Sequence, residues 1–258
     1  GELGSDLNAG GGVIIGRATP RAPQTGDWRA RLLMLTLRAV RSGSSGALAA
    51  ALPGNGGGGN VATILPSTEA AQVERAARAI EEELRTSMPG FTLAIGFSRH
   101  TDDAGQLHRA GKEALMAANV GDAEGRSPIA FDDTGSYRLL LPAMSEDPGE
   151  LERFFDETVA PLAAYDDQYQ TELVATVEAY LDNDGNVTPT AETLFTHRHT
   201  VRYRLERVRE LCGHDMGSTE GREKIGLGLK AMRVLGIAAP GGPALEPGAK
   251  GGRSKRGD

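Results

Sequence analysis

The sequence predicts an α+β fold, in which a sheet-and-helix domain precedes an all-α domain. In the first 142 residues short apolar runs alternate with amphipathic stretches, whereas from Pro148 onward the hydrophobic period is helical. A glycine-rich segment at 53–60 also separates two apolar runs, as in a β-hairpin. The length of 258 residues is enough for one or two domains with hydrophobic cores of their own.

The first half is expected to form a domain of sheet and helices at 13–142, preceded by a flexible glycine-rich linker at 1–12. In order, the expected elements are a strand at 13–15, a helix at 28–41 capped by Asp27, a hairpin of 47–52 and 61–65, a helix from a Ser67 or Thr68 cap to 86, a strand at 91–97, a helix opened by Asp102 or Asp103, and a strand at 129–131.

The second half is expected to contain helices throughout. An acidic connecting helix at 143–168 leads into an all-α domain at 169–237, and a Pro, Gly and basic tail at 238–258 is expected to be disordered. One helix face is predicted by the stripe of Leu151, Phe154, Phe155, Thr158 and Leu162, and a later helix is expected to end at Gly185. Thr188, followed by Pro189, is expected to cap a short helix, and Thr196 to cap a helix at 197–211 that ends at Gly213. Ile225, Leu229 and Met232 mark a last helix.

The composition excludes several classes of protein. Lys and Arg number 28 against 35 Asp and Glu, so the net charge of −7 and the pI near 5.4 argue against a generic polyanion binder. The single cysteine, Cys212, excludes a disulfide framework and suits the reducing cytoplasm, where we expect the protein to act. The longest apolar run, near 32–37, is far shorter than the roughly 20 residues of a membrane span, so no membrane partner is expected.

One helix of the second half is strongly basic. Residues 197–209 contain five arginines and one glutamate, a net of +4, and follow a short helix after a tight turn, which is the helix-turn-helix arrangement. Val201, Leu205 and Val208 are expected to pack inward. Arg198, His199, Arg202, Tyr203 and Glu206 are then left outside. Such a helix suits contacts to guanine edges and phosphates; the alternative is a solvated arginine-rich helix without a ligand.

The same segments resemble the C-terminal helix-turn-helix of PucR/CdaR-type transcriptional regulators. The resemblance is carried by 173–181, by 191–194, by His197-Arg198-His199-Thr200-Val201-Arg202-Tyr203-Arg204-Leu205 and by Leu211-Cys212-Gly213. In that family the helix begins His-Arg-Asn-Thr, and His199 stands here in place of Asn, so the paired hydrogen bonds of an amide to adenine cannot form there. The resemblance implies DNA contacts by Arg198, Thr200, Arg202, Tyr203 and Arg204, and more weakly by His197 and His199. It also implies double-stranded operator DNA, a homodimer and RNA polymerase as partners, and a sensory domain preceding the two domains.

The first domain resembles the degenerate GGDEF-like domain of the same family, including Tyr137-Arg138-Leu139-Leu140 and Tyr165-Asp166. Active diguanylate cyclases place carboxylates at the hairpin to hold metal ions on the nucleotide phosphates. Here the hairpin reads Gly58-Gly59-Asn60-Val61-Ala62, and no Asp or Glu occurs between Asp27 and Glu69. We therefore expect no catalytic residue, no metal and no cofactor, and a role in dimerisation or signal relay.

Two alternatives remain at this point. The chain could be a nucleotide-binding or cyclase-like signalling domain with an accessory helical module for protein interaction. It could also be a protein-interaction scaffold whose basic helix binds an acidic partner. His197, His199, Cys212 and His214 resemble metal ligands in composition, but residues two apart on a helix point to nearly opposite sides. A separate hypothesis concerns the twelve acidic residues between 146 and 184, which either form a solvated face or cover the basic helix in an off state.

Overall fold

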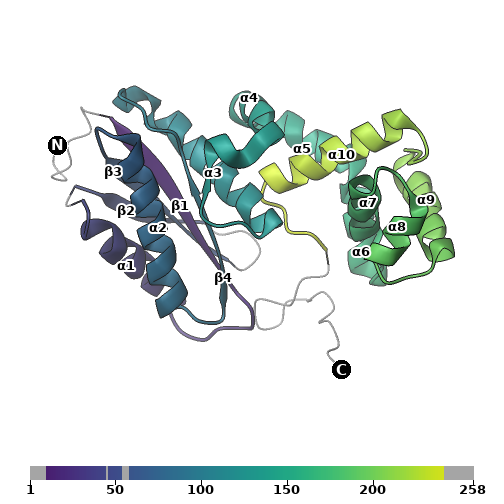
Figure 1. Cartoon of the computed structure of the whole chain (residues 1–258), viewed down its shortest axis with the longest axis horizontal. Coiled ribbons are helices and arrows are strands. Elements are labelled where there is room, and N and C mark those ends of the chain that lie inside the picture. The colour runs from purple at the N-terminus through teal and green to yellow at the C-terminus, as the bar shows by residue number, and fades with distance from the viewer. Residues whose placement is uncertain (1–9, 45, 54–57, 241–258) are drawn as a thin grey trace. The chain divides into compact units, whose positions relative to one another are not determined.

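A computed structural model describes residues 10–44, 46–53 and 58–240 (Figure 1). The chain divides into two compact units with the boundary between Glu146 and Asp147. The α+β class is confirmed, since the first unit holds a sheet with helices and the second holds helices. The predicted tail from 241 on, most of the predicted linker and the turn at 54–57 lie outside the described residues, and the predicted domain limits stay predictions.

The first unit is built on a five-stranded sheet in the order β2-β3-β1-β4-β5. All neighbouring pairs are antiparallel except β4 with β5. Its elements are β1 (Gly11–Pro20), α1 (Trp28–Arg41), β2 (Leu48–Leu52), β3 (Gly59–Pro66), α2 (Ala70–Ser87), β4 (Phe91–Phe97), η1 (Ala104–Gln106), α3 (Leu107–Glu124), β5 (Ile129–Ala130), η2 (Phe131–Leu140) and α4 (Leu141–Glu146).

Helices cover both faces of this sheet because β1 alternates two sets of apolar side chains. Ile14 and Ala18 are buried in the larger core with residues of α1 and α2, while Val13 and Ile15 pack against the alanines of α3. The central strand β1 is paired on both sides, with β3 and with β4. It is consequently longer than the predicted 13–15, because pairing on both edges holds its glycines, Arg17 and Thr19 in extended conformation.

Most of the other predicted elements of the first unit are confirmed, but one predicted cap is wrong, and η2 and α4, which follow β5, were not predicted. Asp27 caps α1 by accepting a hydrogen bond from Ala30 N at 3.1 Å, and the hairpin of β2 and β3 is confirmed. Asp103 opens η1 ahead of α3. The prediction of Ser67 or Thr68 as the cap of α2 is wrong, because α2 begins after Glu69 and the Ser67 hydroxyl accepts instead from the Glu69 N–H.

The second unit consists of six helices over its described residues. They are α5 (Pro148–Thr158), α6 (Ala160–Tyr169), α7 (Leu173–Asp182), α8 (Val187–Thr193), α9 (Arg198–Cys212) and α10 (Thr219–Val234). The apolar stripe expected to run from Leu151 to Leu162 is divided between α5 and α6, which meet at Val159 next to Pro161. Ile225, Leu229 and Met232 are buried as predicted.

Side-chain caps define the ends of these helices. Asn186 caps α8, accepting from Thr188 N at 3.1 Å, and His197 caps α9, so the predicted caps at Thr188 and Thr196 are each displaced. Gly213 ends α9 at φ 74°, as predicted. The buried carboxylate of Asp166 accepts from the backbone N–H groups of Leu173 and Val174 at 2.8 and 2.9 Å, which fixes the start of α7.

Candidate nucleic-acid interface

Helices α8 and α9 form a helix-turn-helix. Val201 and Val208 of α9 are fully buried, and Ala191 of α8 is buried with them, so the predicted inward face is confirmed at these positions; Leu205 is half-buried. The turn is closed by backbone hydrogen bonds from Phe195 N to Glu192 O at 3.1 Å and from Thr196 N to Ala191 O at 2.9 Å. These contacts fix the direction of α9 relative to α8.

The outward face of α9 carries the predicted set of side chains. Arg198, His199, Arg202 and Tyr203 are exposed, and so is Glu206. Among the residues that the structure describes, Arg198 and Arg202 have no hydrogen-bond or ion-pair partner for their guanidinium groups. Both lie in the first half of α9, where the orphan N–H groups of the helix terminus also favour an anion. This part of the helix offers two uncompensated positive charges to the solvent.

The two histidines at the start of α9 are organised by the helix terminus. His197 accepts through Nδ1 from the backbone N–H of His199 at 3.3 Å, and the two imidazole rings stack with centroids 5.0 Å apart. Both side chains are exposed, while Thr200 is half-buried behind them. His197 therefore both caps the helix and stands at the edge of the exposed basic face.

Arg204 differs from the other predicted contact residues. Its side chain is 18% exposed and turns toward α7, where it donates to Thr176 Oγ1 at 3.1 Å and to Glu172 Oε2 at 2.9 Å. The family resemblance implies a DNA contact for this residue, yet the structure engages both of its terminal nitrogens in contacts with Thr176 and Glu172. Its position indicates a role in placing the helix.

The last two arginines of α9 also have partners within the unit. The Arg207 guanidinium lies over the rings of Tyr165 and Tyr203 and forms an ion pair with Glu210 at 2.7 Å. The hydrogen bond with Tyr203, and then the charge of Glu210, raise the pKa of Arg207. Arg209 pairs with Glu206 at 3.6 Å. Of the five arginines, the two in the first half of the helix are thus the ones without partners among the described residues.

The acidic residues between 146 and 184 contribute to packing within the second unit. Glu172 holds Arg204, and Glu178 pairs with Arg233 of α10 at 3.1 Å. The described residues show no carboxylate of this stretch bonded to Arg198 or Arg202. The autoinhibitory contact stays a prediction.

The histidines and the cysteine of this region do not form a metal site within the part of the chain that the structure describes. Across the described ranges no group of three or more His, Cys, Asp or Glu side chains is placed to hold an ion. The Cys212 thiol donates to the Val208 carbonyl oxygen at 3.0 Å, and partial burial raises its pKa.

None of the helices formed by the described residues is both long enough and apolar enough to cross a bilayer.

The hairpin end of the first unit contains a buried arginine, which the sequence did not single out. Arg17 of β1 donates to Asn60 Oδ1 at 3.0 Å and to Asn119 Oδ1 at 2.5 Å, and forms an ion pair with Asp122 at 3.1 Å. Asn60 in turn donates to the Pro53 carbonyl oxygen at 3.1 Å. A guanidinium with fixed partners therefore lies beside the hairpin, and the hairpin sequence itself contains no Asp or Glu between Asp27 and Glu69.

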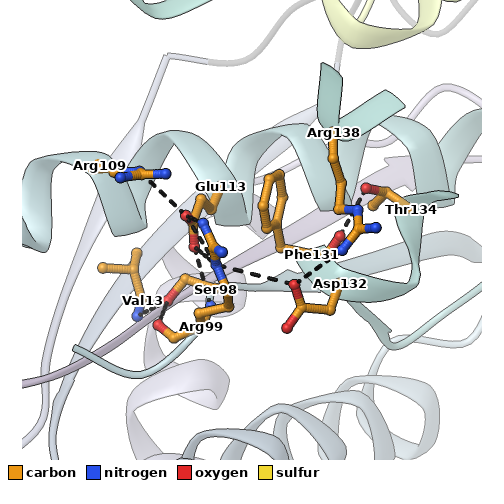
Figure 2. Close-up of polar contacts among 9 residues, drawn as sticks. All are labelled: Val13, Ser98, Arg99, Arg109, Glu113, Phe131, Asp132, Thr134 and Arg138. Atoms are coloured by element: carbon orange, nitrogen blue, oxygen red, sulfur yellow. Dashed lines mark hydrogen bonds and ion pairs between the residues drawn. The ribbon is translucent and has the colours of Figure 1, made fainter. Parts of the chain in front are cut away.

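A second charged cluster lies at the end of β4 (Figure 2). The buried carboxylate of Glu113 on α3 accepts hydrogen bonds from the side chain and from the backbone N–H of Arg99. The Nε atom of Arg109 lies 3.5 Å from Oε1 of the same carboxylate. The hydrogen bond with Glu113 raises the pKa of Arg99, whose guanidinium lies over the ring of Phe131. The cluster connects β4, α3 and η2, and each of these arginines has a carboxylate partner.

Comparison with known proteins identifies both parts of the chain. Residues 173–231 match the family of the PucR C-terminal helix-turn-helix domain, and residues 1–120 match the GGDEF-like domain. The first match spans α7 to most of α10 and contains all seven of the predicted contact residues.

Several curated relatives are similar to this chain. The proline-responsive transcriptional activator PutR of Bacillus subtilis is 29% identical over 134 residues, which are 52% of this chain and 32% of that protein. The purine catabolism regulatory protein of the same organism is 33% identical over 86 residues, 33% of this chain and 16% of that one. An uncharacterized protein of Thermomonospora curvata is 33% identical over 141 residues, 49% of this chain and 77% of that one.

The matches to the first two relatives span a third of those proteins or less. Both domain types nevertheless occur here in one chain, the GGDEF-like domain first and the helix-turn-helix second. The chain belongs to the PucR-type transcriptional regulators.

Proposed function

We propose that the protein is a cytoplasmic transcriptional regulator that binds operator DNA in a sequence-specific way, with the first half of α9 in the major groove. The observation that supports this most directly is the contrast among the arginines of α9. Arg198 and Arg202 are exposed and have no partner among the described residues, whereas the three that follow are engaged within the second unit. Uncompensated charge at this position suits a phosphate or a guanine edge.

The contact residues take different roles in this proposal. Arg198 and Arg202 supply bidentate donors to base edges or phosphates, and the hydroxyls of Thr200 and Tyr203 supply phosphate contacts. His197 and His199 stand beside the helix terminus, where a phosphate is favoured. Arg204 acts indirectly, because its contacts with α7 hold α9 at its angle to the rest of the unit.

For the GGDEF-like unit we propose a role in homodimerisation or signal relay without catalysis. The guanidinium of Arg17 lies beside the hairpin and engages the carboxylate of Asp122 on α3, and the hairpin sequence supplies no carboxylate of its own to hold a divalent cation. A homodimer would read two half-sites about 34 Å apart, or a multiple of that, and RNA polymerase would be a further partner at the promoter.

Binding by single-arginine variants tests the DNA contact. A duplex is first selected from a randomised library by the wild-type chain, and its Kd is then measured by fluorescence anisotropy for R198A, R202A and wild type. We expect a loss of about ten- to a hundred-fold for each variant, with unchanged thermal unfolding, because each bidentate contact to a base supplies roughly 1–3 kcal/mol of discrimination.

The matched control is R153A, which removes an exposed arginine from α5 of the same unit and therefore the same amount of charge. Its affinity should fall little. Wild-type affinity in both R198A and R202A would contradict the assignment of this face to DNA, as would equal losses in R153A.

A further inference from the structure

One side chain in the turn before α9 is exposed without any evident role in the fold. Phe195 is 97% exposed and has φ 49°, in the left-handed region. The other two non-glycine residues with positive φ among the described ones are Gln170 and Asp184, both of them polar and exposed. Phe195 therefore combines a large apolar surface in water with a backbone conformation that favours glycine.

The structure of the turn does not require a phenyl ring at this position. Both hydrogen bonds that close the turn, from Phe195 N and from Thr196 N, use backbone atoms, which any residue would supply. Full exposure leaves the apolar surface of the ring unburied, so folding gains no hydrophobic free energy from it. Glycine would adopt the same backbone conformation without the steric penalty.

The position of Phe195 points to what the ring contacts. It lies three residues before Arg198 and two before His197, at the entrance to the exposed basic face of α9. A duplex held by that face presents phosphates to the cationic groups and, beside them, apolar atoms of two kinds, which are the thymine C5-methyl group and the C–H groups of deoxyribose.

We infer that Phe195 is a DNA-contacting residue that packs its ring against apolar atoms at the edge of the bound groove. The inference rests on the proposed function and extends the interface from α9 into the turn between α8 and α9. The apolar contact complements the charges of His197 and Arg198, because it is independent of salt whereas contacts to phosphates weaken as salt rises.

The test separates folding from binding. The probe is the duplex selected from a randomised library by the wild-type chain, and the variants are F195G and F195N, since glycine and asparagine both tolerate the left-handed conformation. We expect Kd to rise about ten-fold in each variant while Tm stays equal to that of the wild type or increases. The loss should persist at high salt.

The matched control is Q170G, which relieves the same left-handed backbone in the same unit without removing an apolar side chain. It should raise Tm or leave it unchanged, as F195G does, and should leave Kd unchanged. Equal losses of affinity in Q170G and F195G would overturn the inference, since flexibility of the unit rather than the ring would then control binding.

A second arm identifies the apolar atoms. Replacing each thymine of the probe in turn by deoxyuridine removes one C5-methyl group. If one position weakens the wild type but not F195G, the ring contacts that methyl group; if no position does and F195G is still weakened, it contacts deoxyribose. Either result supports the inference.

Two outcomes oppose it and differ from each other. Wild-type affinity in F195G and F195N overturns the inference, and if activation of transcription were then lost, the ring would belong to a protein contact instead. Failure of the wild-type chain to select any duplex would overturn the proposed function itself, before any variant is compared.

Discussion

Arginine serves opposite purposes in the two units. Arg17 in the first unit is buried in the central strand, and its guanidinium is bound by Asn60, Asn119 and Asp122. Arg198 and Arg202 in the second unit are exposed at the start of α9 without partners among the described residues. Positive charge holds one unit together and is available to a ligand in the other.

This difference shows why the number of arginines in a segment is a poor measure of its capacity to bind DNA. Three of the five arginines of α9 are engaged within the unit, like Arg17, although they lie on the same helix as the two that are not. Local pairing distinguishes them. Substitutions that remove one arginine at a time therefore test the comparison, from the buried one to those at the surface.

The largest effect is expected from R17M. Methionine fills part of the volume but leaves the buried Asn60 and Asn119 and the half-buried Asp122 without their shared donor. We expect the free energy of unfolding of the first unit to fall by about 3 kcal/mol, as for removal of one partner from a buried ion pair. Urea denaturation measures this loss.

The control for R17M is R21M, which removes the exposed arginine just after β1. It should change the stability by less than about 0.5 kcal/mol. A similar small change in R17M would show that the network around Arg17 does not stabilise the sheet, and the comparison between the units would fail.

A smaller effect is expected from R204A. Among the arginines of α9, Arg204 most resembles Arg17, because its guanidinium group bonds side chains of the same unit. Loss of its contacts with Thr176 and Glu172 should lower the free energy of unfolding by about 1 kcal/mol. The affinity for DNA should fall less than in R198A and by a similar factor for all duplexes. Denaturation and anisotropy on the same samples measure both effects.

A double-mutant cycle with E172Q sharpens this prediction. If Arg204 and Glu172 stabilise the contact between α9 and α7, the combined loss will be smaller than the sum of the two single losses. Fully additive losses in stability, together with a loss of affinity as large as that of R198A, would instead place Arg204 in the DNA interface.

The smallest effect is expected from the addition of GTP and Mg²⁺, which should yield no turnover. Arg17 engages the Asp122 carboxylate beside the hairpin, and the hairpin sequence lacks a carboxylate for the metal. Product analysis by chromatography after incubation checks this. Formation of a cyclic dinucleotide would contradict the proposed role of the first unit.

Local signals predicted most of the elements well. The helix after Asp27 and the helix end at Gly213 were predicted correctly because each depends on a side chain or a backbone conformation encoded at that position. The caps predicted at Thr188 and Thr196 are wrong by two residues and by one residue, because the side chains of Asn186 and His197 accept instead from Thr188 N and His199 N at the two helix starts.

Contacts between distant segments could not be predicted in the same way. The partners of Arg17 lie 43, 102 and 105 residues away, and the Glu172 that engages Arg204 lies 32 residues before it. A polar residue in an apolar strand is a signal of such a network but does not identify its members. The exposed face of α9 was predictable because it follows from helical periodicity within one segment.

The close crossing of α5 and α10 has a consequence for how such proteins can recombine. At Gly228 on α10, a Cβ atom would lie 2.2 Å from Thr158 Oγ1 of α5, so the two helices approach too closely for any side chain there. The family match begins at Leu173, after α5 and α6, whereas the compact unit begins at Asp147. A helix-turn-helix domain transferred to another protein without α5 would lack the helix that packs against Gly228, so the folding unit extends beyond the residues of the family match.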